Sequence, residues 1–222
     1  MSVEANWQEI KTTIAEACRN CGRDLKEITV VAVTKYVSVE RAREALAAGI
    51  MDLGENRMKG FLEKYQAIGD DATWHFIGSL QSRKVKEIIG EVDYIHSLDR
   101  KSLAKEINKR AESPVSCYVQ VNVSGEESKH GLALDEVEEF IEWLKDYPNV
   151  NVVGLMTMAP HVDDEEMLRG TFRKLRAMRD RIRDKHYPHA PCKELSMGMS
   201  NDYKLAIEEG ATCIRLGSSL VG

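Results

Sequence analysis

Eight short apolar runs alternate with amphipathic segments along the whole chain, and this alternation restricts the fold more than any other feature. Parallel strands need a crossover between them, so strict strand and helix alternation predicts a parallel sheet with right-handed connections. Eight such units are the number found in a closed (β/α)8 barrel. The expected strands are 28–35, 50–54, 74–78, 92–97, 115–123, 152–158, 194–197 and 213–216.

Segments with a helical spacing of apolar residues separate these runs. A leading helix is expected over 3–19, with Gly22 as its stop signal. Further helices are expected over 38–49, 56–68, 82–89, 101–111, 135–146, 164–186 and 201–209. We therefore predict an α/β fold with one domain over 1–222, a single (β/α)8 TIM barrel with an extra N-terminal helix. A doubly wound open sheet is the alternative, but no G-x-G-x-x-G follows the first strand to support dinucleotide binding on it.

The first strand, ITVVAVTK, is an unbroken apolar and β-branched run that ends on Lys35. Such a run is typical of a strand that is covered on both faces. A lysine at its carboxyl end either faces a cavity, where a desolvated amine becomes a nucleophile for an aldehyde, or reaches out to solvent. For a single lysine at a strand end, a side chain that reaches solvent is favoured. Only other segments of the sequence can favour the cavity instead.

Composition excludes several classes of function. The chain has 30% charged and 43% hydrophobic residues, a net charge of -5 and a pI near 5.8, which argues against a nucleic-acid partner. The basic stretch 169–185 alternates with apolar residues at helical spacing, which indicates a solvated helix face. Five scattered cysteines, no signal peptide and no membrane-spanning run predict a cytoplasmic protein.

No metal site is expected. Cys18 and Cys21 form a C-x-x-C without a second pair, inside a helical pattern, so helix packing is favoured. His75 and His96 belong to no matching ligand set, which favours roles in the core or behind a binding site. The strand ends carry no paired carboxylates, which disfavours a glycosidase or a carboxylate-bound metal.

Two loops rich in small residues follow the seventh and eighth expected strands. SMGMSND, 196–202, precedes a helix, and its backbone N–H groups and hydroxyls fit a phosphate as well as they fit a simple helix cap at Ser200. IRLGSS, 214–219, is a second Gly/Ser turn. Barrel enzymes frequently hold a phosphate in the loops after strands seven and eight, so the two loops together favour a phosphate site.

Three more residues have two interpretations each. Arg215 lies in an apolar strand, where it could face an acceptor nitrogen of a ligand or form an ion pair with a carboxylate across the barrel. Asn56 and Met156 could contact the two faces of a planar ligand. Taken alone, Asn56 is more typical of a helix cap and Met156 of a core gap-filler.

These segments together resemble one known family. The runs VAVTKYVS, GENR, WHFIGSLQSRK, IHSLD, VNVSGEESKHG, VVGLMTMAP, ELSMGMSNDY and IRLGS have the order and spacing of the pyridoxal phosphate homeostasis protein family, also called the proline synthetase co-transcribed homologue family. That family is similar in fold to the N-terminal barrel of alanine racemase, the fold type III of pyridoxal 5'-phosphate (PLP) proteins. The resemblance implies PLP as the cofactor. It also implies the following cofactor contacts: Lys35 as the covalent PLP aldimine (Schiff base), Ser200, Gly217 and Ser218 at the phosphate, Arg215 at the pyridine nitrogen, and Asn56 and Met156 beside the ring.

The chain departs from the family at its C-terminal end. Members commonly continue beyond a pattern like RIGTAIFG, whereas this sequence reads RLGSSLVG and stops at Gly222. This leaves open whether the C-terminus is truncated. It also leaves open which hydroxyl or amide of Ser218 and Ser219 contacts the phosphate.

The resemblance implies a carrier and regulator of PLP that acts in vitamin B6 and amino-acid homeostasis without evident catalytic activity. A physical reason is that racemisation needs an acid/base group on each face of the substrate, and alanine racemase takes the second from a separate β domain that this chain lacks. The alternatives are a PLP-dependent amino-acid racemase and a phosphate-ligand barrel without a covalent link. We expect a monomer, with PLP-requiring apoenzymes as a further class of partner.

Overall fold

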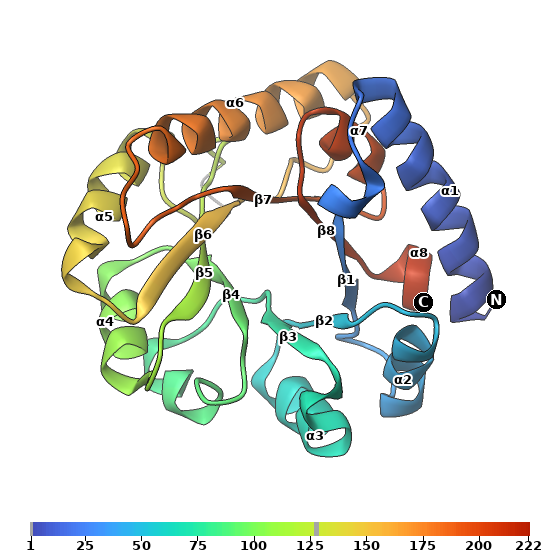
Figure 1. Ribbon diagram of the computed structural model, residues 1–222, viewed down its shortest axis with the longest axis horizontal. Coiled ribbons are helices and arrows are strands. Elements are labelled where there is room, and N and C mark those ends of the chain that lie inside the picture. Colours follow the sequence, from blue (N-terminus) through green and yellow to red (C-terminus); the bar gives the residue numbers. More distant parts are fainter. Residues whose placement is uncertain (1, 127–128) are drawn as a thin grey trace.

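The computed structural model describes residues 2–126 and 129–222, and eight parallel strands in it close into one barrel in sequence order (Figure 1). The strands are β1 (Thr29–Val33), β2 (Asp52–Glu55), β3 (Thr73–Phe76), β4 (Tyr94–Leu98), β5 (Val115–Gln120), β6 (Val150–Met156), β7 (Glu194–Met199) and β8 (Cys213–Leu216). β1 pairs with both β2 and β8, which closes the ring. The predicted (β/α)8 barrel is confirmed.

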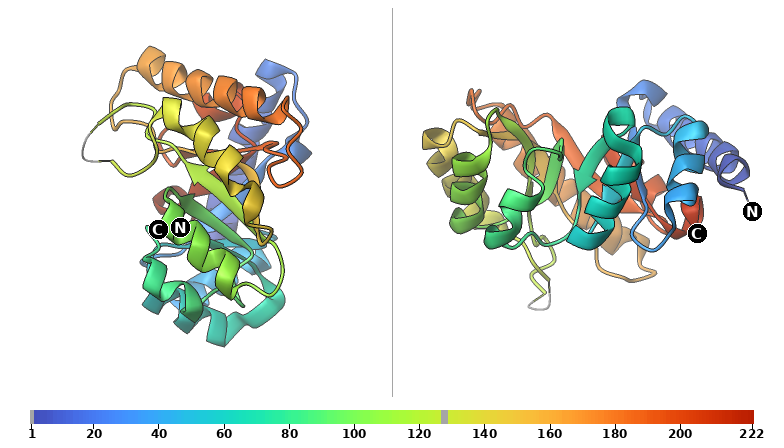
Figure 2. Two further views of the ribbon diagram at one scale, coloured as in Figure 1. Left: turned by 90° about the vertical axis from the view of Figure 1, so that its left-hand side faces the viewer. Right: turned by 90° about the horizontal axis from the view of Figure 1, so that it is seen from below.

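Helices surround the barrel on the outside (Figures 1 and 2). They are α1 (Val3–Cys21), α2 (Val39–Ala47), α3 (Met58–Ile68), α4 (Lys101–Arg110), α5 (Val137–Trp143), α6 (Glu165–Arg183), α7 (Tyr203–Glu208) and α8 (Ser218–Val221). Five 3₁₀ turns are also present: η1 (Leu25–Glu27), η2 (Gly69–Asp71), η3 (Ser82–Glu87), η4 (Leu134–Glu136) and η5 (Leu144–Asp146). In the described part of the chain, no helix combines the length and the apolar character that a membrane crossing needs.

Several expected elements differ from the structure in their bounds or their type. The strand expected over 115–123 ends at Gln120, and the helix expected over 135–146 is the shorter α5 between the turns η4 and η5. The segment 82–89 was predicted as a helix, and it forms the 3₁₀ turn η3, in which Val85 alone is buried. A short connector with one apolar anchor has little helical face to pack, and 3₁₀ geometry is common in such pieces. The first strand was predicted to reach Lys35, but β1 ends at Val33 because Thr34 begins a turn that Val37 N–H closes onto Thr34 O.

The N-terminal helix α1 lies along α7 and α8, beside the seam between β1 and β8 (Figure 1). Ser2 caps its start by accepting from Ala5 N–H, and Gly22 ends it in the left-handed region with φ 70°. Asn6 Nδ2 donates to Leu220 O at 2.9 Å, which ties the first helix to the last residues of the chain. The predicted extra N-terminal helix is therefore confirmed, and it packs against the last two helices of the chain.

The core has two layers. Most buried apolar side chains lie between the strands and the helices, where Trp74 and Phe76 contact Phe61 of α3 with ring centroids 5.5 and 6.3 Å apart. Strand alternation turns His75, between them, to the barrel interior. The apolar part of that interior is a small cluster of Val31, Tyr118, Met156 and Cys213. The described interior also contains the buried polar side chains of His75, His96, Ser196 and Arg215.

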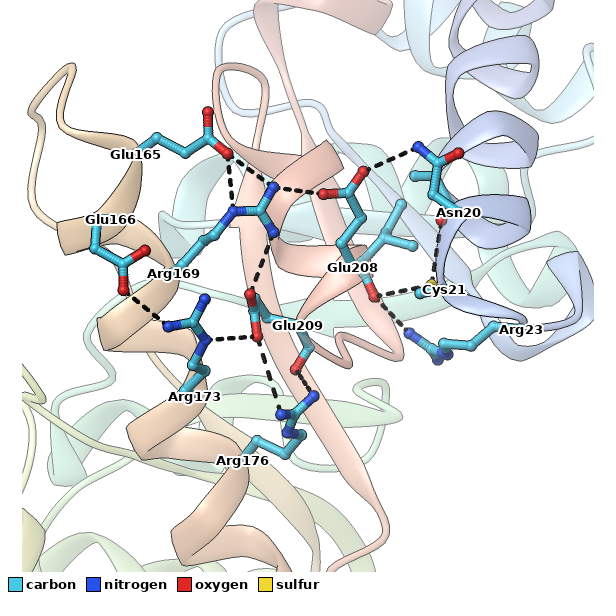
Figure 3. Close-up of polar contacts among 12 residues, drawn as sticks. Asn20, Cys21, Arg23, Glu165, Glu166, Arg169, Arg173, Arg176, Glu208 and Glu209 are labelled. Atoms are coloured by element: carbon cyan, nitrogen blue, oxygen red, sulfur yellow. Dashed lines mark hydrogen bonds and ion pairs between the residues drawn. The ribbon is translucent and has the colours of Figure 1, made fainter.

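An ion-pair network connects α6 to the carboxyl end of α7 (Figure 3). Arg169 of α6 contacts Glu208 at 2.6 Å and Glu209 at 3.2 Å, at the carboxyl end of α7. Arg23, next to α1, donates to the carbonyl oxygen of Ile207 at 3.0 Å. The basic stretch 169–185 is helical as far as Arg183, but its first arginine, Arg169, is partly buried and binds the end of α7, so the face is not purely solvated. The loop that α7 follows carries Ser200.

Candidate cofactor site at the carboxyl ends of the strands

Lys35 lies at the mouth of the barrel, two residues after β1, and its side chain is exposed. Its Nζ is 5.0 Å from the ring centroid of Tyr36, and the guanidinium carbon of Arg57 is 5.8 Å from the same centroid. Tyr36 is 73% exposed, so the two cations contact an open aromatic face. In this structure no cavity of described protein groups encloses the Lys35 amine. β1 ends at Val33, and the Lys35 side chain is exposed.

A buried ion pair supports the ends of β1 and β2. Lys64 Nζ lies 2.9 Å from Glu55 Oε1, and Thr34 Oγ1 donates to the same oxygen at 2.7 Å. The Lys64 and Glu55 side chains are 6% and 0% exposed. Because Thr34 precedes Lys35 and Glu55 precedes Asn56, this contact fixes the backbone on which both candidate residues stand.

Asn56 presents an oxygen that the described protein groups leave unused. Its Oδ1 is buried and has no hydrogen-bond partner among the described residues. The backbone of Gly78 approaches closely, since a Cβ there would lie 2.2 Å from Asn56 O. Buried polar atoms without partners are uncommon, so this oxygen indicates a place for a ligand group or a water. No cap hydrogen bond is made at the start of α3, so the helix-cap interpretation of Asn56 finds no support.

The loops after β7 and β8 meet at Ser200. Its Oγ accepts from Gly217 N–H at 3.4 Å, from Ser219 N–H at 3.5 Å and from the Ser219 hydroxyl at 3.0 Å. Three donors thus converge on one point at the carboxyl end of the barrel. Ser218 is exposed beside this group. The sequence left the choice between Ser218 and Ser219 open, and the structure brings Ser219 to Ser200.

Arg215 is buried at the end of β8, with 5% of its surface exposed. Its Nη1 donates to Ser196 Oγ at 2.5 Å and its Nη2 to Thr157 O at 2.9 Å. No carboxylate pairs with it among the described residues, so the ion-pair interpretation is not supported. Burial lowers the pKa of Arg215, yet a guanidinium remains cationic in proteins. Two of its five N–H groups are used, which leaves donors for a ligand.

Met156 and the histidines belong to the interior. Met156 is the last residue of β6, is 1% exposed, and packs with Tyr118, as expected of a core gap-filler. His75 and His96 contact each other at 2.9 Å. Both rings are almost fully buried, which agrees with a place in the core or behind the binding site.

These features fit PLP. The donors that meet at Ser200 Oγ could bind a phosphate. Arg215 has further N–H groups that could donate to an acceptor, and Asn56 Oδ1 has no partner among the described residues. A cavity of about 290 Å³ beside Asn201 and Asp202 is lined by none of these residues and is a separate feature between the loop after β6, α6 and α7. Sequence reasoning missed the contacts of Thr157 and Ser196 with Arg215, and it left Ser219 as one of two alternatives. The Gly-Ser-Ser turn was the only signal for Ser219, and nothing in the sequence pairs Ser196 with Arg215.

Comparisons with known proteins identify the family of the chain. The family model described as alanine racemase, N-terminal domain, matches residues 2–222. A pyridoxal phosphate homeostasis protein of Aquifex aeolicus is 45% identical over 213 residues, covering 94% of this chain and 92% of that protein. The protein of the same name in Escherichia coli K12 is 32% identical and covers 98% of this chain and 94% of its own length.

Solved structures show the same fold. PipY of Synechococcus elongatus with PLP bound has a TM-score of 0.82 and 30% identity, covering 94% of this chain and 100% of that chain. Alanine racemase from Corynebacterium glutamicum, at 14% identity and a TM-score of 0.72, covers 99% of this chain and 60% of its own, and shares the fold alone. The chain therefore belongs to the pyridoxal phosphate homeostasis protein family, and its barrel has the fold of the N-terminal domain of alanine racemase.

Proposed function

We propose that this protein holds PLP at the mouth of its barrel through Lys35 and acts in intracellular PLP and amino-acid homeostasis. The observation that carries the proposal is the convergence of three donors on Ser200 Oγ, at the same end of the barrel as Lys35. A phosphate that replaces the Ser200 hydroxyl as acceptor for these donors would retain every hydrogen bond and add charge assistance. The relatives named above support the identity of the ligand.

Each candidate residue has one task in this proposal. PLP, when bound, supplies an aldehyde that condenses with a primary amine with loss of water. Lys35 supplies that amine, and its open surroundings give the ring room to enter. Ser200, Gly217 and the Ser218–Ser219 turn would bind the phosphate, and Arg215 would donate to the pyridine nitrogen. Asn56 and Met156 would lie beside the ring.

The proposal includes the absence of efficient catalysis on amino acids. A pyridine nitrogen that faces a permanent cation stays unprotonated, so the ring withdraws electrons less strongly. His75, one candidate for a second base, is 1% exposed and has both ring nitrogens engaged by His96 and Asp52. It cannot serve a ligand at the mouth. The names of the relatives agree with a homeostatic role.

The decisive experiment combines spectroscopy and mapping. Purified protein should show a cofactor absorbance band that borohydride bleaches, and peptide mass mapping should then find the added mass on the peptide that contains Lys35. Absence of any band in protein saturated with PLP would support the phosphate-ligand barrel without a covalent link.

Location and assembly are part of the same proposal. All five cysteines are unpaired thiols, which is typical of a reducing compartment such as the cytoplasm. We expect a monomer, and light scattering of the purified protein checks this. Transfer of cofactor to PLP-requiring apoenzymes would be measured as restored activity of such an apoenzyme on mixing.

A further inference from the structure

A continuous hydrogen-bond chain crosses the barrel interior and ends at Arg215. Its links are Asp52 Oδ1 to His75 Nε2 at 2.9 Å, His75 Nδ1 to His96 Nε2 at 2.9 Å, His96 Nδ1 to Ser196 Oγ at 2.9 Å, and Arg215 Nη1 to Ser196 Oγ at 2.5 Å. These residues come from β2, β3, β4, β7 and β8. We call this chain the interior relay.

The interior relay joins the two ends of the barrel. Asp52 is the first residue of β2, on the amino-terminal side, and its side chain is 27% exposed. His75, His96 and Ser196 are at most 1% exposed. Arg215 is near the carboxyl end of β8, where the candidate cofactor site lies. An acidic side chain in contact with solvent is thus connected through three buried polar side chains to a buried guanidinium.

Aromatic side chains hold the two imidazole rings in place. Tyr94 stacks on His75 with centroids 4.5 Å apart and an interplanar angle of 4°. Tyr118 lies against His96 with centroids 4.3 Å apart. Rings confined between such neighbours keep their nitrogens on the line of the relay.

The positions of the protons in the relay can be assigned from its Asp52 end, because an ionised carboxylate can only accept hydrogen bonds. An ionised Asp52 carboxylate accepts, so His75 must donate from Nε2, and a neutral His75 then accepts at Nδ1. His96 must therefore donate from Nε2 and accept at Nδ1, which requires the Ser196 hydroxyl to donate to it. Ser196 Oγ in turn accepts from Arg215. Every hydrogen bond of the relay is thus donated in the same direction, from the guanidinium toward the carboxylate. Both histidines are then neutral Nε2–H tautomers.

A protonated histidine would break this order. If His75 or His96 were protonated, both of its ring nitrogens would be donors. One hydrogen bond of the relay would then have two donors and no acceptor, or its direction would reverse. Protonation would also place a second cation in an interior that already contains Arg215. Burial, together with His75 and Arg215, holds the pKa of His96 well below its usual range, in agreement with a neutral ring.

We propose that Asp52, His75, His96 and Ser196 are positioning residues that hold the Arg215 guanidinium in one orientation, so that its unspent N–H groups face an acceptor at the barrel mouth. This inference rests on the proposed function, because the acceptor is the pyridine nitrogen of PLP. Ser196 makes the direct contact, and the two histidines fix the direction in which its hydroxyl points. Without that contact the guanidinium keeps only its bond to Thr157 O among the described residues and can turn.

The first test uses the cofactor-free protein. ¹⁵N spectra of protein labelled at histidine should show His75 and His96 as neutral Nε2–H tautomers at pH 7, with assignments from single-histidine variants. A proton on Nδ1 of either ring, as the other tautomer or as imidazolium, would overturn the one-way relay. This readout decides the relay even if the wild-type protein fails to bind PLP, which would instead refute the proposed function.

The second test compares Ser196→Ala with Ser97→Ala. Ser97 is also buried in a barrel strand, but its hydroxyl has no hydrogen-bond partner among the described residues, so it is a matched control. Ser196→Ala should weaken PLP binding by about tenfold to a hundredfold and leave competition by inorganic phosphate unchanged, since Ser200 and its donors are intact. Equal PLP affinities of the two variants, or a parallel loss of phosphate competition in Ser196→Ala, would show a merely structural role for Ser196.

Discussion

Lys64 Nζ and Glu55 Oε1 lie 2.9 Å apart in an ion pair that is almost completely buried behind the candidate cofactor site. Glu55 also receives the Thr34 hydroxyl, while its second oxygen has no partner among the described residues. A buried carboxylate that loses its cation is strongly destabilising, whereas a buried pair as a whole contributes little. The pair therefore matters most for the placement of Thr34 and Asn56.

Replacing Lys64 with methionine should lower the free energy of unfolding by about 3–5 kcal/mol, because Glu55 is left charged and buried. Urea unfolding followed by circular dichroism measures this. Lys59→Met, at an exposed position of the same helix, is the control and should change the free energy by less than about 0.5 kcal/mol. Equal effects of the two variants would contradict this account, and Lys64→Met/Glu55→Gln should recover part of the loss.

Lys35→Ala should abolish the borohydride-sensitive absorbance band, because no other amine is proposed to reach the cofactor aldehyde. Lys59→Ala again serves as a control for the removal of an exposed lysine and should keep the band. The measurement is an absorbance spectrum at saturating PLP, before and after reduction. A persistent band in Lys35→Ala would move the covalent link to another lysine.

Removal of the Ser200 hydroxyl should weaken retention of PLP by about tenfold to a hundredfold, the effect of losing one hydrogen bond to a charged group. Ser219→Ala should act in the same direction, since the Ser219 hydroxyl lies 3.0 Å from Ser200 Oγ. Ser218→Ala tests the residue implied by family resemblance, and we expect a smaller effect because that side chain is exposed. Equilibrium dialysis of the three variants ranks them, and an unchanged Ser200→Ala would exclude Ser200 from the site.

The stability of the protein should fall as the pH decreases below about 6.5. His96 has a pKa well below 6.5 in the folded state because of burial, His75 and Arg215. Below 6.5 the unfolded chain therefore binds a proton that the folded chain excludes, so the contribution of His96 is present above that pH and is lost as the pH falls toward the folded value. One such proton changes the free energy of unfolding by at most about 1.4 kcal/mol per pH unit. Urea unfolding between pH 7 and 5 should show a smaller slope for His96→Gln than for wild type. Identical slopes would mean that His96 binds protons equally in the folded and unfolded chains, which would contradict a lowered pKa in the folded protein.

Incubation of the PLP-loaded protein with L-alanine in deuterated water should give slow loss of the α-proton and no change in optical rotation. The Arg215 cation would keep the pyridine nitrogen unprotonated, so the ring would withdraw electrons less strongly. His75 cannot act as a second base, because both of its ring nitrogens are hydrogen-bonded inside the barrel. Proton NMR follows the exchange, with the Lys35→Ala variant as the blank. Exchange at rates ordinary for enzymes, on the order of 1–1000 per second, would establish the racemase alternative.

The sequence by itself determined the barrel, because strand and helix periodicity and the number of units are local properties of the chain. It also determined which loops are rich in phosphate-type donors, since Gly and Ser directly after a strand have a local meaning. Strand ends were less certain. The apolar run before Lys35 continues beyond the point where the Thr34 turn ends β1, and a turn closed by one hydrogen bond leaves little trace in hydrophobicity.

Only the tertiary structure decided which residues meet across the barrel. Ser196 and Arg215, or His75 and His96, belong to different strands, and their contacts depend on the register of the closed sheet. The direction in which each side chain points changes with a shift of one residue, which no pattern within a single strand specifies. The same reason explains why Ser219 rather than Ser218 meets Ser200. Local spacing supplied the chemical groups, and long-range register assembled them into one site.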